Sequence, residues 1–448
     1  MKNVLVLGAG MVAGAHVRYL LNQGDFHVTV ASRTLAKAQE IVAGHPRGLA
    51  VQLNSNDEAA MEKLIAQADL AVSLLPYAYH PTVAKFCVKH CVQMVTTSYV
   101  KDAMAQLDGP AKAAGVILLN EIGVDPGIDH MTAMRVIHGV QRGGGEITGF
   151  MSWCGGLPAP EANTNPFGYK FSWSPRGVLL AGKNSAHYLM DGEDVSVPAG
   201  EIFDHTWTVP VEVEGRVIDF EGYPNRDSLP YMHAYGIDGA RTMFRGTLRN
   251  AGWCRTLRKI AQLGLLAEEP RNDIGGLTFA GFTALLSGAP ATANAHDLRE
   301  ALAARLGVAP DSKVIEDLAW LGLLSGDPLP PNASAPIDIL TARMLEKMSY
   351  AEGERDLLVL QHRFQARYGS RVEKITSTMV DFGIPHGDTS MSRTVGLPAA
   401  IGVRLILEGR IKLTGVQTPV VPEVYEPVLT ELEALGIHFI ETIEAAPR

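Results

Sequence analysis

The stretch VLVLGAGMVAGA, residues 4–15, decides the fold of the first part of the chain. An apolar run leads into a GxGxxA pattern that begins at Gly8 and ends at Ala13. In such a pattern the first glycine permits a tight turn, the second lets the backbone approach a pyrophosphate, and the alanine lets helix and strand pack closely. The N-terminus of the following helix favours the anion. We therefore expect a dinucleotide to contact Gly8, Gly10, Met11 and Val12.

Further apolar runs follow at regular intervals and alternate with amphipathic segments. These runs are residues 27–32, 50–54, 70–76, 93–98 and 116–120. Strands that alternate with helices form parallel sheets with helices on both faces. The predicted fold class is therefore α/β, with a Rossmann-type doubly wound parallel sheet.

The sequence changes in character after Pro126. Stretches rich in glycine, proline and tryptophan, such as residues 153–177, alternate with short strands, which predicts a mixed α+β substrate domain. Leucine- and alanine-rich segments then predict a small inserted helical domain. The helical final stretch is expected to pack back on the nucleotide domain. The expected domains are 1–125 with about 390–448, then 126–250 with about 345–389, and 251–344.

The end of the second strand indicates which dinucleotide binds. An NAD site usually carries an acidic residue there for the ribose hydroxyls. This chain has Ser32, Arg33 and Thr34, and a guanidinium can bind a 2′-phosphate. NADP is therefore the predicted cofactor. Ligands of doubly wound sheets gather at the carboxyl ends of the strands, so the same site should include Asn54, Ser73, Leu74, Ser98, Tyr99, Ile122, Val124 and Asp125.

Several long strings of the sequence resemble the saccharopine dehydrogenase family, in its glutamate-forming branch, whose members are also called saccharopine reductases. They are SLLPYAYHPTVAK (73–85), VTTSYV (95–100), NEIGVDPGIDH (120–130), residues 154–180, EGYPNRDS (221–228), RGTLR (245–249), LAWLGLL (318–324), KMSYAEGERD (347–356) and RTVGLPAA (393–400). The resemblance implies that saccharopine, NADP and water are interconverted with L-glutamate, 2-aminoadipate 6-semialdehyde and NADPH in lysine metabolism, including amino-acid biosynthesis.

The resemblance also implies substrate-binding residues. The substrate carries three carboxylates, and planar guanidinium groups can bond both oxygens of a carboxylate. The implied substrate-binding residues are Ser98, Tyr99, Asp125, Arg226, Thr247, Leu248 and Arg249. Arg226 and Arg249 could instead form salt bridges at a domain interface, Ser98 and Tyr99 could bond backbone, and Asp125 could cap a helix or turn.

The residues expected around the reacting atoms are Tyr99, Asp125 and Cys154, where Cys154 lines the site because hydride transfer requires no covalent nucleophile. Ser174 matches a position that contacts the cofactor. A general acid or base needs a pKa near the working pH, and Lys101, Asp125 and His130 stay open as candidates. No metal is expected, because Cys87, His90 and Cys91 lack a second ligand cluster.

Composition excludes other classes of protein. The net charge is −9 without long runs of like charge, which disfavours a nucleic-acid partner, and no segment is apolar for the length of a membrane span. Four scattered cysteines favour a reducing compartment, so we expect a cytoplasmic enzyme, and the resemblance implies a homodimer.

Three other interpretations stay open. A related imine reductase could act on a polyamine conjugate, as carboxynorspermidine dehydrogenases do, although the arginines of NRDS and RGTLR favour an acidic substrate. An NAD-dependent degradative enzyme is disfavoured by Arg33. A catalytically silent NADP-binding protein is the third, although the Ser98-Tyr99 pair and the arginines are present.

Overall fold

The computed structural model describes residues 1–445 and divides into two compact units. Of the described residues, the first unit comprises 1–148, 234–237 and 362–445, and the second comprises 149–233 and 238–361. Within the described part of the chain, every helix is too short or too polar to cross a bilayer.

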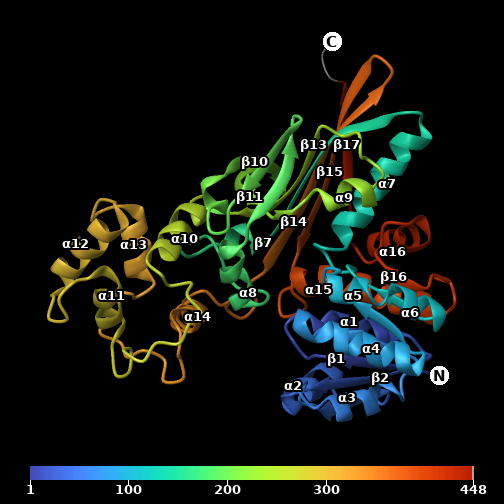
Figure 1. Ribbon diagram of the computed structural model, residues 1–448, viewed down its shortest axis with the longest axis horizontal. Coiled ribbons are helices and arrows are strands. Elements are labelled where there is room, and N and C mark those ends of the chain that lie inside the picture. Colours follow the sequence, from blue (N-terminus) through green and yellow to red (C-terminus); the bar gives the residue numbers. More distant parts are fainter. Residues whose placement is uncertain (446–448) are drawn as a thin grey trace. The chain divides into compact units, whose positions relative to one another are not determined.

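The first unit contains a seven-stranded sheet in the order β16-β6-β5-β4-β1-β2-β3, and every pair in it is parallel (Figure 1). This order confirms the predicted doubly wound sheet. The strands are β1 (Lys2–Leu7), β2 (Phe26–Ser32), β3 (Gly48–Gln52), β4 (Leu70–Ser73), β5 (Gln93–Thr96), β6 (Ile117–Leu119) and β16 (Gly415–Gln417).

Helices connect these strands and bury their apolar sides on the sheet. They are α1 (Ala13–Asn22), α2 (Leu35–Val42), α3 (Glu58–Ile65), α4 (His80–His90), α5 (Asp102–Ala105), α6 (Asp108–Ala113) and α7 (Ile128–Arg142). The strands of the sheet centre are almost fully buried because helices cover both faces, as in Val4, Val72 and Val95.

The final stretch of the chain contributes α15 (Ser390–Leu407), α16 (Pro422–Ala434) and β17 (Ile440–Ala445), and β17 pairs antiparallel with β15 (Arg371–Phe382). Helix α15 packs directly on α1, where the Nδ1 of His16 lies 3.1 Å from the carbonyl oxygen of Gly396. A Cβ on Gly396 would lie 3.0 Å from the carbonyl oxygen of Val12, so a side chain at this position would require backbone atoms to shift. Helix α15 thus supports α1, the helix that follows the glycine-rich turn.

The second unit is built on strands and small helices. Strand β13 (Thr242–Arg249) lies between β11 (Arg216–Pro224), to which it is antiparallel, and β7 (Glu146–Pro158), to which it is parallel. The other strands are β8 (Ala186–Met190), β9 (Glu193–Val197), β10 (Trp207–Val213), β12 (Arg226–Asp227) and β14 (Asp356–Tyr368). Strands β7 and β14 have residues in both units.

The helices of this unit are α8 (Pro175–Leu180), α9 (Pro230–Ala234), α10 (Trp253–Gln262), α11 (Phe279–Ser287), α12 (Ala295–Leu306), α13 (Lys313–Trp320) and α14 (Pro336–Lys347). Helix α9 reaches the residues that belong to the first unit. Figure 1 shows α11, α12 and α13 gathered together, and they correspond to the predicted helical segment.

Candidate active site

The glycine-rich turn after β1 has the geometry of a phosphate-binding turn. Gly8 has a φ of +114°, and a Cβ on it would lie 2.9 Å from the carbonyl oxygen of Leu74 at the end of β4. A Cβ on Gly10 would instead meet no heavy atom within 4 Å. Val12, the residue before α1, does not cap the helix with its side chain, and within the first turn Ala15 N donates to Ser392 Oγ at 3.4 Å. Gly8 is therefore needed for the close approach of two strands, whereas Gly10 borders open space suited to an anion.

The end of β2 presents a guanidinium. Arg33 is exposed and forms no ion pair with any residue from 1 to 445. Its backbone is held in place, because the side-chain amide of Gln52 donates to its carbonyl oxygen at 3.3 Å and Thr34 N donates to Ser32 Oγ at 3.3 Å. Asn54, after β3, is also exposed. A free cation on a fixed backbone at this strand end suits a 2′-phosphate.

The ends of β5 and β6 bring two of the predicted residues together. The Tyr99 hydroxyl donates to Asp125 Oδ1 at 2.9 Å, and both side chains are partly exposed. Glu121 N donates to the carbonyl oxygen of Ser98 at 3.1 Å, which ties the two strand ends together. Ile122 and Val124 are buried beside Asp125, so any contact that they make with a ligand involves little of their surface.

A tight loop presents Asp125. Gly123 N donates to the carbonyl oxygen of Pro126 at 2.9 Å, and a Cβ on Gly127 would lie 2.1 Å from the carbonyl oxygen of Gly123. Only glycine fits such an approach. The loop is therefore held in one conformation by its own backbone.

The three candidate acids and bases have different surroundings. The side chain of His130 is 0% exposed, and its nitrogens lie 2.8 Å from Glu121 Oε2 and 2.5 Å from the Tyr235 hydroxyl. Lys101 is exposed, with its Nζ 3.8 Å from the centre of the Tyr77 ring. Asp125 is the partly exposed carboxylate that accepts from Tyr99. Direct proton exchange with a substrate thus suits Asp125 and Lys101 better than His130.

Arg249 is the centre of the second unit's candidate site. It is 4% exposed, and its guanidinium carbon lies 4.9, 5.9 and 5.6 Å from the rings of Tyr169, Tyr223 and Trp253. Its Nη1 donates to the carbonyl oxygen of Leu248 at 2.7 Å, and its Nε has no hydrogen-bond partner among the described residues. The Tyr169 hydroxyl and Trp253 Nε1 have no hydrogen-bond partner there either. Three buried polar groups without partners therefore gather in one place.

Burial raises the pKa of two tyrosines around this guanidinium, that of Tyr223 to about 12, so both stay neutral. A buried guanidinium among neutral aromatic rings lacks the carboxylate that usually compensates a buried charge. This arrangement suits an anionic ligand.

The other predicted residues of this unit lie around the same strands. Cys154 is 7% exposed and stands opposite Thr247 in the pairing of β7 with β13. Leu248 is fully buried, so its side chain is a core residue. Arg226 is exposed at the start of β12 with a φ of +59°. The Oγ of Ser174, which is exposed, caps α8 by accepting from Gly177 N at 3.3 Å.

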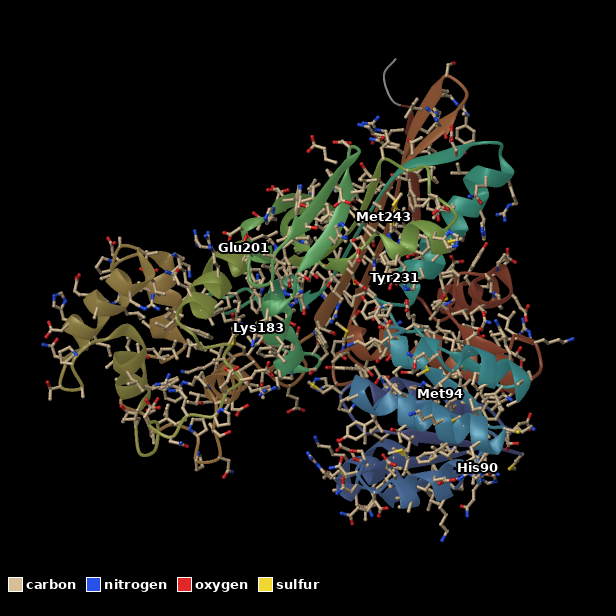
Figure 2. All side chains as sticks on the ribbon, in the orientation of Figure 1. His90, Met94, Lys183, Glu201, Tyr231 and Met243 are labelled. Carbon is tan, nitrogen blue, oxygen red and sulfur yellow. The ribbon has the colours of Figure 1, made fainter. Side chains whose placement is uncertain are left out.

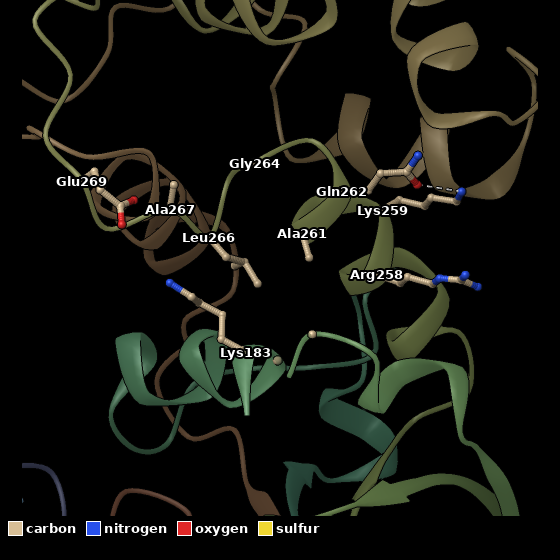
Figure 3. A pocket seen from close by; sticks show the side chains of 11 residues that line it. Lys183, Arg258, Lys259, Ala261, Gln262, Gly264, Leu266, Ala267 and Glu269 are labelled. Carbon is tan, nitrogen blue, oxygen red and sulfur yellow. Dashed lines mark hydrogen bonds between the residues drawn. The ribbon is translucent and has the colours of Figure 1, made fainter. Parts of the chain in front are cut away.

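A separate pocket of the second unit contains none of the predicted site residues. Figure 3 shows it between η3 (Ala181–Lys183), α10 and the segment that ends at Glu269. Its cations already have partners, since Arg258 pairs with Asp204 and Lys183 lies 3.4 Å from Glu268. We therefore do not assign the chemistry to this pocket.

Cys87 and His90, which the sequence places close together, have different surroundings in the fold. Cys87 is fully buried in the core of the first unit. His90, labelled in Figure 2, has its Nε2 2.7 Å from Glu62.

Sequence reasoning did not identify the contacts of three groups that hold the site residues in place. Glu121 accepts from Val100 N at 2.8 Å, His80 lies between the hydroxyls of Ser73 and Ser98, and the rings of Tyr169 and Trp253 surround Arg249. The strings SLLPYAYHP and NEIGVDPG contain the first two, but only the folded chain shows which groups they face.

Comparisons with known proteins match the whole chain. The family model "Saccharopine dehydrogenase NADP binding domain" matches residues 4–119, and "Saccharopine dehydrogenase C-terminal domain" matches residues 123–437. The chain is 40% identical over 451 residues to the saccharopine dehydrogenase [NADP(+), L-glutamate-forming] of Schizosaccharomyces pombe, covering 99% of each chain. It is 37% identical to the mitochondrial alpha-aminoadipic semialdehyde synthase of Mus musculus over 98% of this chain and 47% of the mouse protein. The apo saccharopine dehydrogenase (L-Glu forming) of Saccharomyces cerevisiae superposes with a TM-score of 0.89 at 38% identity, covering 99% of this chain and all of the other.

Proposed function

This chain belongs to the saccharopine dehydrogenase family, and we propose that it oxidises saccharopine with NADP and water to L-glutamate, 2-aminoadipate 6-semialdehyde and NADPH, or runs the reverse reduction. The observation that carries this proposal is the similarity to three fungal enzymes of that name, at 38 to 40% identity over essentially the full chain. A shared activity over the full length is the simplest account of such similarity.

The residues of the first unit fit NADP. The open space beside Gly10 and the uncapped start of α1 would receive the pyrophosphate, and Arg33 would pair with the 2′-phosphate. When bound, the nicotinamide accepts or donates the hydride. Leu74 and Asn54, which follow β4 and β3, complete the proposed cofactor site. Ser73 and Ser174 are less direct candidates because their hydroxyls are engaged with His80 and Gly177 N.

The arginines of the second unit support the substrate assignment. Saccharopine is a tricarboxylate, and Arg249 is a buried guanidinium without a carboxylate partner among the described residues. Arg226, Thr247 and Ser98 are the further groups that we propose bind carboxylate oxygens. A polyamine tail would meet a cation here and would be repelled.

Tyr99 and Asp125 are proposed at the reacting centre. Asp125 can stabilise the positive charge of the secondary amine, and the hydrogen bond from Tyr99 fixes the direction of its carboxylate. Cys154 is proposed only to line the site. Lys101 and Asp125 remain the candidates for moving a proton.

An assay of saccharopine oxidation tests the proposed activity and the preferred cofactor. Purified protein is mixed with saccharopine and either NADP or NAD, and the appearance of reduced nicotinamide is followed by absorbance, beside an Arg33→Asp variant. We expect faster reduction of NADP, and loss of that preference in the variant. Binding of NADPH without turnover would support a silent NADP-binding protein instead.

We further propose a cytoplasmic homodimer whose domains follow the three predicted segments, with 251–344 as a separate helical domain. All four cysteines are free, which fits a reducing compartment. Among the described residues, strand β17 pairs with β15 alone and exposes Ile440 and Ile443. An open strand edge of this kind can pair with a second copy. Sedimentation equilibrium of the full chain would show a monomer if the dimer proposal is wrong.

A further inference from the structure

His80, the first residue of α4, connects two strand ends inside the first unit. Its Nδ1 lies 2.8 Å from the Oγ of Ser73, the last residue of β4, and its Nε2 lies 2.8 Å from the Oγ of Ser98, just after β5. The imidazole is 4% exposed and Ser73 is fully buried, whereas Ser98 is partly exposed. The chain of hydrogen bonds therefore runs from the core to a residue that a ligand can reach.

The acceptors available to the Ser73 hydroxyl fix the donor and the acceptor in each of these hydrogen bonds. Among the described residues the Ser73 hydroxyl has one hydrogen-bond partner, His80 Nδ1. A buried hydroxyl whose proton has no acceptor is costly, so Ser73 must donate to Nδ1. The neutral ring then carries its proton on Nε2 and donates it to Ser98.

Thr96 supports the same tautomer independently. Its hydroxyl donates to the carbonyl oxygen of Ser73 at 2.9 Å, so its Oγ1 presents lone pairs to the other groups around it. That oxygen lies 3.5 Å from His80 Nε2 and accepts from Ser98 N at 3.4 Å. An unprotonated Nε2 would therefore face a second acceptor, whereas a protonated Nε2 faces two suitable oxygens. Burial lowers the pKa of His80 to about 4, which keeps the ring neutral near pH 7.

We propose that His80 is a positioning residue which, through the Ser73–His80–Ser98 chain, makes the Ser98 hydroxyl a hydrogen-bond donor toward a carboxylate of the substrate. Because Ser98 Oγ accepts from His80, its own proton is directed to another acceptor. A carboxylate accepts hydrogen bonds and cannot donate them, so this polarity matches an acidic substrate. The part that concerns the substrate rests on the proposed function.

The tautomer can be measured without turnover. In full-length protein with ¹⁵N-labelled histidine, the imidazole nitrogens of His80 are identified by the signals that disappear in His80→Gln. We expect the shift pattern of a ring protonated on Nε2. A pattern with the proton on Nδ1 overturns the proposal.

Two substitutions of His80 test its hydrogen bonds to Ser73 and to Ser98 separately. A glutamine amide reaches about as far as Nε2 of histidine, so His80→Gln keeps a donor for Ser98. An asparagine amide reaches only about as far as Nδ1, so His80→Asn keeps only the contact with Ser73. We expect His80→Asn to raise the KM for saccharopine about 10-fold, with a smaller change in kcat. His80→Gln should restore a KM within about 2- to 3-fold of the wild type. The NADPH dissociation constant and the thermal midpoint serve as controls for folding.

A double-mutant cycle completes the test. Ser98→Ala should raise KM as much as His80→Asn does, and adding His80→Asn to Ser98→Ala should have little further effect. Independent effects of the two substitutions, or a normal KM in either single variant, would overturn the proposal. If the wild-type protein binds NADPH but does not turn over saccharopine, the proposed function is wrong. The measured tautomer of His80 then still shows whether the Ser73–His80–Ser98 hydrogen bonds have the proposed direction.

Discussion

At the scale of single residues, Arg249 shows how function and stability can oppose each other. Its guanidinium is buried among aromatic rings and bonds one backbone oxygen, Leu248 O, with no carboxylate partner among residues 1–445. Cation–π contacts compensate a buried charge only in part. A ligand carboxylate would supply the missing partner, so we infer that the unliganded protein keeps this charge at a cost.

Arg249→Met should therefore lower kcat/KM for saccharopine by about 10- to 100-fold, the effect of one lost charge-assisted interaction. The thermal midpoint of the unliganded protein should not fall, because an apolar side chain replaces an unpaired buried charge. Arg258→Met is the matched control: Arg258 is about half exposed and pairs with Asp204, so its loss should leave both quantities nearly unchanged. A midpoint that falls together with activity would indicate a structural role for Arg249.

At the scale of elements, the two glycines of the first turn have different tasks. Gly8 lies where β1 and the end of β4 approach each other, and a Cβ there would contact the Leu74 carbonyl oxygen at 2.9 Å. Gly10 borders open space. Gly8→Ala should therefore lower the thermal midpoint of the unliganded protein. Gly10→Ala should leave the midpoint unchanged yet weaken NADPH binding about 10-fold or more, as crowding of about 1–3 kcal/mol implies.

Fluorescence titration with NADPH and thermal melts of both variants check this difference. Equal loss of stability in the two variants would mean that the turn acts only as a structural turn.

The contact between α1 and α15 gives a second prediction at this scale. Gly396→Ala would place a methyl group 3.0 Å from the carbonyl oxygen of Val12 and from His16 N, and backbone atoms cannot easily move aside. We expect a loss of about 1–3 kcal/mol in stability. Gly139→Ala, in the interior of α7 where a Cβ meets nothing within 4 Å, should instead stabilise by about 0.4–1 kcal/mol. Urea unfolding of the two variants measures both signs, and equal shifts would contradict the packing argument.

At the scale of the whole molecule, the sequence predicts what depends on local pattern. Three features were recognisable because each depends on neighbours in sequence: the GxGxxA turn, the alternation of strands and helices, and the cation of Arg33. The contacts of His80 and the aromatic rings around Arg249 were not, because Ser98 lies 18 residues from His80 and Tyr169 lies far from Arg249 in sequence. Likewise, strand β16 joins the parallel sheet beside β6, some 300 residues earlier in the chain, through three residues that carry no periodic signal.

Buried histidines give the chain a predicted dependence of stability on pH. Burial lowers the pKa of His16 and of His80 from 6.5 to about 4, and burial also lowers the pKa of His138. Between pH 6.5 and 4 the unfolded chain binds protons that the folded chain does not, so stability is fully present above pH 6.5 and is lost as the pH falls. By pH 5 the loss should be about 2 kcal/mol for each of His16 and His80.

Thermal melts at constant ionic strength should therefore show one midpoint from pH 8 to 7 and a lower midpoint at pH 5. Carboxylates whose pKa is lowered by ion pairs, such as Glu62 beside Lys89 and Asp108 beside Lys112, start from ordinary values of 4.5 and 3.8, so the stability that they contribute is lost mainly below pH 5. In His80→Gln the fall between pH 7 and 5 should be smaller, because one of the groups that binds a proton only when unfolded is gone. An equal fall in wild type and variant would show that His80 binds a proton as readily in the folded protein as in the unfolded chain, which would contradict a pKa lowered by burial.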